Sequence, residues 1–541
     1  MTADAVFDVV IVGAGPAGCV LASRLSEDAN RTAALIEAGP DYGTDRAAWP
    51  SDLRDPWQIW RDSHTWGFTH ANRPTDRPSP LARAKVVGGS STVNGCVWLR
   101  GSAADYDQWA ELGNPGWAWA DLLPYFRKIE SDPMGGDMHG SDGPVPVYRV
   151  DTTNLNPVDQ AFVATADELG FDYVSDANGA PGQRPGVGPL PKNIADGERI
   201  NAAFTYLARA RGRDNLTIIS DTHVDRVSIV GDGLYGAASA DGRVKNGNER
   251  AAVGDKLLFK GRKAVGVYTA NGQFIWGREV IIAAGAYCSP AILIRSGIGP
   301  AARLEELGIP VIADRPGVGE HLLDHPNINE AFVRDFEIKP EFAPAVKSYM
   351  PLVVKGRANA SDSEIDYHLY LGQAFDEERD AWVFWMSVPL QWATSRGSVR
   401  ITSTDPYAAP EIDHNWLSDP VDLEALCDGV EVCCRLVSTP PLSNMFVPGS
   451  GELPPWQDRD ALRAWVRDNV STTWHPSSTC RMGPADDPMA VVDAEGKVYG
   501  VNNLRVIDAS IFPTGPRANL HCTVTAVAER IADVIQGSIP A

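Results

Sequence analysis

The feature that most constrains the fold is an apolar segment near the N-terminus that runs into a glycine-rich turn. Residues 6–12 read V-F-D-V-V-I-V, a mostly β-branched run that predicts a fully buried parallel strand. Gly13, Gly15 and Gly18 follow in G-x-G-x-x-G spacing, and residues 17–26 predict a helix. Such glycines permit a tight turn, close approach of the backbone to a pyrophosphate and close helix–strand packing. Phosphate groups would then lie at the helix N-terminus.

A second apolar segment, residues 33–36, ends directly before Glu37. A carboxylate at this position would accept hydrogen bonds from the 2′,3′-diol of a ribose and repel a 2′-phosphate. A structural glycine turn in another kind of α/β protein is the alternative. The order strand, glycine turn, helix, strand and acid favours a dinucleotide site.

Length and composition restrict the remaining possibilities. A chain of 541 residues is too long for one ordinary core, so we expect two domains. We expect no nucleic-acid partner because acidic residues outnumber basic ones by 70 to 48. No run of about 18 apolar residues predicts a membrane span, and residues 1–8 leave no room for a signal peptide. We therefore expect a cytoplasmic protein. The eight cysteines show no zinc-binding spacing, so we predict buried free thiols and no metal site.

Several other segments carry structural predictions. Trp57, Trp60 and Trp66 could pack in a core or wall a pocket. Residues 101–130 predict helical structure, and residues 241–255 an exposed polar excursion. Alternating apolar and polar residues between 326 and 410 predict antiparallel strands.

The final helix is predicted from an apolar stripe of helical spacing. Val524, Val527 and Ile531 belong to this stripe, and Thr523 is expected to cap the helix just after His521. The positive end of the helix dipole would then point toward charge that develops in a neighbouring site.

Three further motifs carry a resemblance to a known family. Residues 84–107 contain G-G-S-S, Asn94, Trp98 and Gly101, residues 285–299 read G-A-Y-C-S-P-A-I-L-I-R-S-G-I-G, and residues 317–326 read G-V-G-E-H-L-L-D-H-P. With these motifs the chain resembles the glucose–methanol–choline (GMC) oxidoreductases, FAD-dependent alcohol oxidases and dehydrogenases, from about Val6 to Gln536. The branch of choline oxidase and of hydroxymethylfurfural and aryl-alcohol oxidases is the most similar.

The resemblance implies an α/β fold (α+β overall) in which a Rossmann-like FAD-binding domain is interleaved with a substrate domain. The substrate domain would be built on an antiparallel sheet flanked by helices. We assign residues 1–155, 196–325 and 480–541 to the FAD-binding domain, and residues 156–195 and 326–479 to the substrate-binding domain.

The resemblance also implies which residues contact the cofactor. Glu37 would bind the adenosine ribose, Asn94 and Gly95 would lie along the isoalloxazine, and Val224 would contact adenine. The full set of expected FAD contacts is Gly13, Gly15, Ala17, Gly18, Glu37, Ala38, Trp66, Val87, Asn94, Gly95, Val224, Trp474, Asp508, Ala509 and Thr523. Some family members attach FAD through a histidine in the second glycine-rich loop. Val93 stands at that position, so we expect non-covalent FAD.

Two histidines are the predicted catalytic residues. Oxidation of an alcohol requires a base for the hydroxyl proton and a partner for the oxygen, and imidazole suits both tasks because its ordinary pKa is about 6.5. The resemblance implies that His475, in T-W-H-P, is the base. His521, in N-L-H-C, replaces an asparagine common in choline-type members.

The predicted activity is oxidation of a primary alcohol, aliphatic or aromatic, to the aldehyde and on to the acid in some cases. The hydride would pass to flavin N5, and oxygen or another acceptor would reoxidise the cofactor. The alternatives are an FAD-containing hydroxynitrile lyase-like enzyme, a dehydrogenase with a non-oxygen acceptor, and a non-catalytic flavin-binding protein. The sequence predicts neither the particular alcohol nor the oligomeric state.

Overall fold

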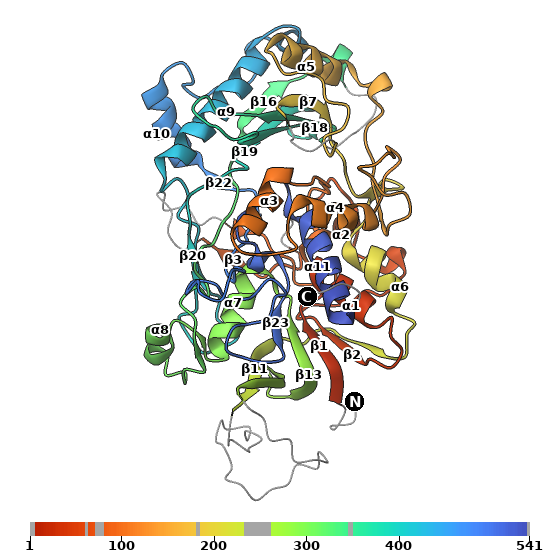
Figure 1. Ribbon diagram of the computed structural model, residues 1–541. Coiled ribbons are helices and arrows are strands. Elements are labelled where there is room, and N and C mark those ends of the chain that lie inside the picture. The colour runs from red at the N-terminus through yellow and green to blue at the C-terminus, as the bar shows by residue number, and fades with distance from the viewer. Residues whose placement is uncertain are drawn as a thin grey trace, which may run out of the picture.

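The computed structural model describes residues 6–59, 63–70, 80–179, 184–231, 261–343 and 350–537, with the backbone alone at 330–335. Two sheets organise these residues. Figure 1 shows the strands of the first sheet in the lower half of the molecule and the strands of the second in the upper half. Helices α3, α4 and α11 lie between them in this view. The predicted mixed α/β fold is confirmed.

The first sheet has seven strands in the order β10-β2-β1-β13-β12-β11, with β23 also paired to β13. The predicted buried strand is β1, which pairs in parallel with β2 on one side and β13 on the other. Strands β11, β12 and β13 are joined antiparallel. The bounds are β1 Val6–Val12, β2 Ala33–Ile36, β10 Leu216–Ile219, β11 Val224–Val230, β12 Lys263–Thr269, β13 Phe274–Ile282 and β23 Leu504–Val506.

Three helices pack beside the first sheet. Helix α1 (Pro16–Leu25) follows the first glycine turn, α7 (Gly285–Arg295) follows β13, and α11 (Leu520–Gln536) contacts α1. Arg24 on α1 forms ion pairs with Glu529 and Asp533 on α11. The C-terminal helix is thereby fastened to the helix that begins at the glycine turn.

The single helical region predicted for residues 101–130 is two helices, α3 (Ala103–Glu111) and α4 (Trp119–Lys128). Gly113 and Gly116 between them have φ values of +90° and +80°, which disfavour an L side chain. The helix therefore ends at Glu111, and the apolar residue Leu112 that follows it is 46% exposed.

The final helix begins earlier than the sequence predicts. Asn519 is its N-cap residue and Leu520 its first residue, so His521 lies in the first turn. Thr523 does not cap the helix, because its buried hydroxyl is 2.8 Å from the hydroxyl of Tyr106. Val524, Val527 and Ile531 are buried, as the apolar stripe predicts.

The second sheet has six strands, β22-β16-β19-β18-β17-β7, all antiparallel. It confirms the antiparallel strands predicted after residue 326. Its bounds are β7 Gly186–Pro189, β16 Pro326–Glu337, β17 Leu352–Gly356, β18 Tyr367–Asp376, β19 Ala381–Pro389 and β22 Ser471–Thr472. Helices α5 (Pro157–Glu168), α9 (Pro420–Ser438) and α10 (Arg459–Asn469) supply apolar residues to the core beside it.

The remaining described elements are short. The helices are α2 Ser51–Arg54, α6 Ala208–Ala210 and α8 Ala301–Glu306. The short strands pair as β3 Phe68–Thr69 with β4 Pro80–Leu81, β5 Glu130–Ser131 with β6 Val145–Pro146, β8 Ile194–Ala195 with β9 Glu198–Arg199, β14 Ile298–Gly299 with β15 Ala313–Asp314, and β20 Ser398–Arg400 with β21 Glu411–Asp413.

The seven strands of the first sheet fall within residues 1–155, 196–325 and 480–541, and the six of the second within 156–195 and 326–479. The domain boundaries themselves stay a prediction. Trp60 and the excursion expected at 241–255 lie outside the described residues.

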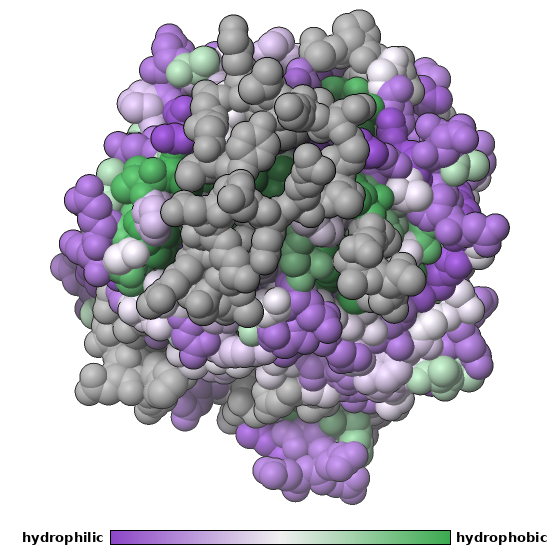
Figure 2. Space-filling view, turned by 90° about the horizontal axis from the view of Figure 1, so that it is seen from below, coloured by the Kyte–Doolittle hydropathy of each residue, from purple (hydrophilic) through white to green (hydrophobic). Residues whose placement is uncertain are grey.

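The surface and the cysteines agree with the composition. Seen from the end of the molecule below β11 and β13, hydrophilic residues form most of the rim of the described surface, and apolar residues gather toward the centre of the view (Figure 2). All eight cysteines are free thiols, and seven of them are buried. Among the residues that the structure describes, no helix has both the length and the apolar character needed to cross a bilayer.

Candidate active site

One cavity brings together residues from both sheets. The turn after β1, the end of β2 and the second glycine-rich loop line it from the side of the first sheet. Residues of β16, β18 and β19 line it from the second sheet. His475 and His521 both face this cavity, although they are far apart in the sequence.

The first glycine turn is built as its spacing predicts. Gly13 has a φ of +100°, and a Cβ atom there would lie 2.5 Å from the Ala283 carbonyl oxygen. A Cβ on Gly18 would lie 1.9 Å from the Gly13 carbonyl oxygen, so only glycine allows α1 to pack so closely. Gly15 has open space at the corresponding position and lines the cavity with Ala17. This cradle at a helix N-terminus fits a pyrophosphate.

The second glycine-rich loop lies against the first. A Cβ on Gly89 would come within 2.6 Å of the Gly15 Cα, and the Gly88 N–H donates to the Ala14 carbonyl at 2.8 Å. Asn94 and Gly95 line the cavity at the end of this loop. The two loops together leave backbone, and few side chains, beside the space for a flat ligand.

Glu37 lies at the cavity wall and is almost completely buried. Its carboxylate accepts hydrogen bonds from the Ala14 N–H at 2.8 Å and the Gly39 N–H at 3.1 Å. Burial raises the pKa of Glu37 to about 7, against the opposing effect of these hydrogen bonds. The neighbouring Ala38 also lines the cavity. The position suits recognition of a diol at the end of β2.

Trp66 and Val224 line another part of the cavity together with His223. The Trp66 and His223 rings meet edge to face at 5.4 Å, and the Lys85 ammonium lies 5.2 Å from the Trp66 ring centre. Trp66 is therefore in the pocket wall, one of the two roles that the sequence allowed for the tryptophans.

Asp508 and Ala509 line the cavity beyond β23. The Asp508 carboxylate accepts hydrogen bonds from the Gly285 N–H at 2.8 Å, the Ser289 hydroxyl at 2.6 Å and the Ser510 N–H at 2.8 Å. These bonds join the C-terminal segment to the start of α7 at the edge of the cavity.

The hydrogen bonds around His475 determine its neutral tautomer. Asn519 accepts from the Tyr370 hydroxyl at 2.8 Å through Oδ1, so its amide nitrogen faces His475 Nε2 at 3.2 Å. His475 Nε2 therefore carries a lone pair, and the Nδ1 proton is shared with His325 Nδ1 at 2.9 Å. Asp324 holds the turn, since its carboxylate accepts from the His475 N–H at 2.9 Å.

In His521 the two ring nitrogens have the opposite roles, with the proton on Nε2 and the lone pair on Nδ1. Asn94 Oδ1 accepts from the Cys96 N–H at 3.1 Å, which leaves the Asn94 amide nitrogen 3.4 Å from His521 Nδ1. Nδ1 thus accepts, and the proton of the neutral imidazole is on Nε2. The His521 ring also lies edge to face with Trp98, with 5.0 Å between ring centres.

Burial keeps both imidazoles neutral. It lowers the pKa of His521 to about 4 and that of His475 well below its ordinary value, with further lowering at His475 from His325 and Arg83. Arg83 is held over the Tyr287 ring, 5.4 Å from its centre, and donates to the Trp474 carbonyl. Trp474 also lines the cavity and has a φ of +60°.

Three residues expected to contact the cofactor are not in the cavity wall. Gly18 acts through packing, as described, and Thr523 is turned to Tyr106. Val87 is completely buried, and its N–H donates to the Pro40 carbonyl at 3.0 Å. Val93, which carries no nucleophile, is buried and also outside the wall.

Sequence reasoning missed the partners of His475. Asn519 stands two residues before His521, and His325 stands in the segment 317–326 that was noted for its family resemblance. Tyr370 had no such signal, because it belongs to an alternating strand of unremarkable composition. Its contact with Asn519 depends on how β18 meets α11.

Comparison with known proteins identifies the family. Two models described as GMC oxidoreductase match this chain, an N-terminal model at residues 7–327 and a C-terminal model at 393–528. The chain belongs to the GMC oxidoreductase family. It is an FAD-dependent oxidoreductase of CH–OH donors.

Relatives of this GMC oxidoreductase match it along almost its whole length. The oxygen-dependent choline dehydrogenases of Photobacterium profundum and Yersinia pseudotuberculosis are 34% identical over 580 aligned positions and 36% identical over 581, each covering 99% of this chain and 94% of the relative. Among solved structures, pyridoxine 4-oxidase from Mesorbium loti has a TM-score of 0.82 and 29% identity, covering 98% of this chain and 99% of that one. A fungal aryl-alcohol oxidase shares the fold, with a TM-score of 0.76 at 23% identity, covering 99% and 100%.

Proposed function

We propose that this GMC oxidoreductase oxidises a primary alcohol to the aldehyde, with His475 as the proton acceptor and His521 as the hydrogen-bond donor to the alcohol oxygen. The observation that carries the proposal is the pair of opposite tautomers. His475 presents a lone pair at Nε2, and His521 a proton at Nε2. One imidazole is suited to remove the hydroxyl proton, and the other to stabilise charge that develops on the oxygen.

The residues at the cavity fit FAD. The glycine cradle, the Glu37 carboxylate and the flat space beside Asn94 and Gly95 correspond to a pyrophosphate, a ribose and a ring system. When bound, FAD supplies the hydride acceptor, N5 of its isoalloxazine. We propose that it is held without a covalent bond, because Val93 has no nucleophilic side chain.

The chain's own residues orient the alcohol and hold its proton. His475 takes the hydroxyl proton at Nε2, where Asn519 donates in the structure, and its Nδ1 proton remains shared with His325. Burial and the nearby Arg83 disfavour the charged imidazole, so His475 is neutral and able to accept a proton before the reaction. His521 keeps its Nε2 proton and acts only as a donor.

The second sheet supplies uncharged surfaces for the rest of the substrate. These are Asn327, Asn329, Tyr370, Trp385 and Ser387. Aromatic faces with a few amide and hydroxyl groups suit the carbon skeleton of an aliphatic or aromatic alcohol. The similarity to oxygen-dependent choline dehydrogenases supports oxygen as the electron acceptor.

Rapid mixing of the anaerobic protein with an alcohol panel tests the proposal. His475→Ala should bind FAD normally and lose about 10²- to 10⁴-fold in the rate of flavin reduction. His521→Asn keeps an amide donor and should retain much more activity than His521→Ala. If His475→Ala reduces its flavin at the wild-type rate while His521→Asn is inactive, the two roles are reversed. Turnover of substrate without bleaching of the flavin would indicate a lyase.

The pH dependence follows from burial. A base must be neutral, and both imidazoles have lowered pKa values, His521 to about 4. The reduction rate should therefore stay level as the pH falls through 6.5 and decline only at lower pH, in contrast to the neutral-range decline that an ordinary histidine predicts. A measured inflection near pH 7 in single-turnover reduction would show that the cavity is more hydrated than these contacts indicate.

A further inference from the structure

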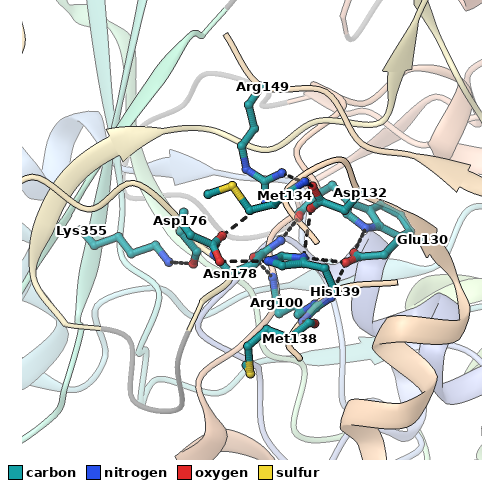
Figure 3. Close-up of polar contacts among 12 residues, drawn as sticks. Arg100, Glu130, Asp132, Met134, Met138, His139, Arg149, Asp176, Asn178 and Lys355 are labelled. Atoms are coloured by element: carbon teal, nitrogen blue, oxygen red, sulfur yellow. Dashed lines mark hydrogen bonds and ion pairs between the residues drawn. The ribbon is translucent and has the colours of Figure 1, made fainter. Parts of the chain in front are cut away.

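Away from the cavity, a buried group of charged residues surrounds His139 in the loop between β5 and β6 (Figure 3). His139 Nδ1 lies 2.9 Å from Glu130 Oε1 and 3.1 Å from Asp132 Oδ2. Nε2 lies 2.9 Å from Asp176 Oδ2. Ionised carboxylates only accept hydrogen bonds, so both ring nitrogens must donate and the ring is an imidazolium. The neighbouring carboxylates accordingly raise its pKa to about 10.

Two arginines complete this group, which we call the His139 cluster. Arg100 pairs with Glu130, and Arg149 pairs with Asp132 and Asp176. The two guanidinium groups and the imidazolium balance the three carboxylates. Glu130, Asp132 and His139 are close enough to share a metal ion, but the cations already neutralise their charge. The cluster is therefore complete as an ion-pair network.

The cluster extends to a tryptophan beside the catalytic pair. Glu130 uses its second oxygen, Oε2, to accept the Trp98 indole N–H at 3.0 Å. Asn178 accepts from the Arg100 N–H and donates to the Trp98 carbonyl at 2.8 Å. Trp98 is completely buried, so its ring has little freedom once the indole N–H and the backbone are both held.

The ring of Trp98 also contacts the ring of His521. The two rings meet at 88° with 5.0 Å between centres. Within the part of the chain that the structure describes, the hydrogen-bond partner given for the His521 ring is Asn94, at 3.4 Å, the limit of a hydrogen bond. An edge-to-face contact with a fixed indole therefore determines how the imidazole is turned toward the cavity.

We propose that the His139 cluster positions His521 through Trp98, with Glu130 as the residue that fixes the indole. Trp98, Glu130 and His139 are positioning residues in this scheme, and none of them touches the substrate. The inference rests on the role proposed for His521 above. It predicts that a change to the indole affects the reaction only while His521 is present.

A double-mutant cycle tests this directly. Trp98→Phe keeps a ring against His521 but removes the indole N–H that Glu130 holds. We expect it to lower the limiting rate of flavin reduction about tenfold, with an unchanged FAD content and an unchanged apparent Kd for the alcohol. In the His521→Ala background, the same substitution should cause no further loss.

Trp117→Phe is the matched control. Trp117 is also completely buried and donates one hydrogen bond, to the Ala494 carbonyl at 2.8 Å, but it does not line the cavity. It should leave the reduction rate unchanged in both backgrounds. If Trp98→Phe purifies without FAD, His139→Gln is used in the same cycle, because it leaves the indole in place and loosens Glu130 together with Asp132 and Asp176.

The outcomes separate this inference from the proposed function. Equal losses from Trp98→Phe in both backgrounds, or no loss in the wild-type background, would overturn the positioning role alone. Full activity in His521→Ala would overturn both. The inference is supported if Trp98→Phe lowers the reduction rate only when His521 is present and Trp117→Phe leaves the rate unchanged.

Discussion

Removal of the Glu37 carboxylate tests whether the end of β2 holds the FAD ribose. In the structure this carboxylate accepts hydrogen bonds from the Ala14 and Gly39 N–H groups, and it is 6% exposed. Glu37→Ala removes both acceptors and the charge. Glu37→Gln keeps one carbonyl acceptor at nearly the same place.

The magnitude follows from the hydrogen bonds lost. A hydrogen bond to a charged group contributes about 1.5–3 kcal/mol, and the ribose diol can donate two to Glu37. Part of this is replaced by water in the variant, so we expect FAD binding to weaken by about 1–3 kcal/mol, roughly 5- to 150-fold in Kd. Glu37→Gln should fall between the wild type and Glu37→Ala.

Fluorescence of released FAD measures this Kd, and thermal unfolding of the FAD-free protein reports damage to the fold. Asp422→Ala is a matched control, because the buried Asp422 carboxylate also accepts two backbone N–H groups, from Thr394 and Ser395, both at 2.8 Å. It should lower the stability of the protein while leaving the FAD Kd near the wild-type value, since Asp422 is not in the cavity wall.

The pH dependence of FAD release adds a second readout. Burial raises the pKa of Glu37 to about 7, so the carboxylate gains a proton as the pH falls below that value. The protonated group accepts fewer hydrogen bonds, and wild-type FAD affinity should therefore decrease from pH 8 to pH 6. Glu37→Gln has no carboxylate to protonate, so its FAD affinity should change less between pH 8 and pH 6. Equal FAD retention in Glu37→Ala and the wild type would refute the ribose assignment.

Three other predictions concern the cofactor linkage, a partner of His475 and the His139 cluster. Acid precipitation should leave yellow FAD in the supernatant, because Val93 offers no linking atom; colour that stays in the washed pellet would contradict this. Tyr370→Phe removes the hydroxyl that orients Asn519, and it should lower flavin reduction about 5- to 30-fold, equivalent to about 1–2 kcal/mol, at unchanged FAD content. Since the pKa of His139 is raised from 6.5 to about 10, its stabilising effect is complete below pH 6.5 and is lost as the pH rises through 10. The urea midpoint should thus fall more between pH 7 and 10 in the wild type than in His139→Gln, and parallel curves would refute the charged cluster.

Local features of the chain were predictable from the sequence. The β-branched run predicts a buried strand, and the spacing of the glycines after it predicts a tight turn with close helix packing. Gly18 is required by its contact with the nearby Gly13, although Gly13 itself is required by φ and by the distant Ala283. Strand β1, the turn at Gly13 and helix α1 were therefore predicted closely. Glu37 was predicted to bind the ribose because it directly follows the second apolar segment, and that segment is indeed a strand parallel to β1.

The ends of helices were less predictable where backbone conformation or distant side-chain partners determine them. The apolar residues between 101 and 130 have helical spacing, but two glycines at positive φ divide them into α3 and α4. Thr523 is a good capping residue by type, yet its hydroxyl contacts Tyr106 from a helix far away in the sequence. Such competition between local and distant partners is settled only in the folded protein.

The identities of His475 and His521 as candidates came from the sequence, whereas their chemistry was decided by tertiary structure. The tautomer of each imidazole depends on which amide atom faces it, and that in turn depends on Tyr370 for Asn519 and on Cys96 for Asn94. The lowered pKa values arise from burial by both sheets together. The direction of a hydrogen bond and the extent of desolvation both depend on neighbours that the fold brings together from distant segments. A local sequence pattern therefore cannot predict them.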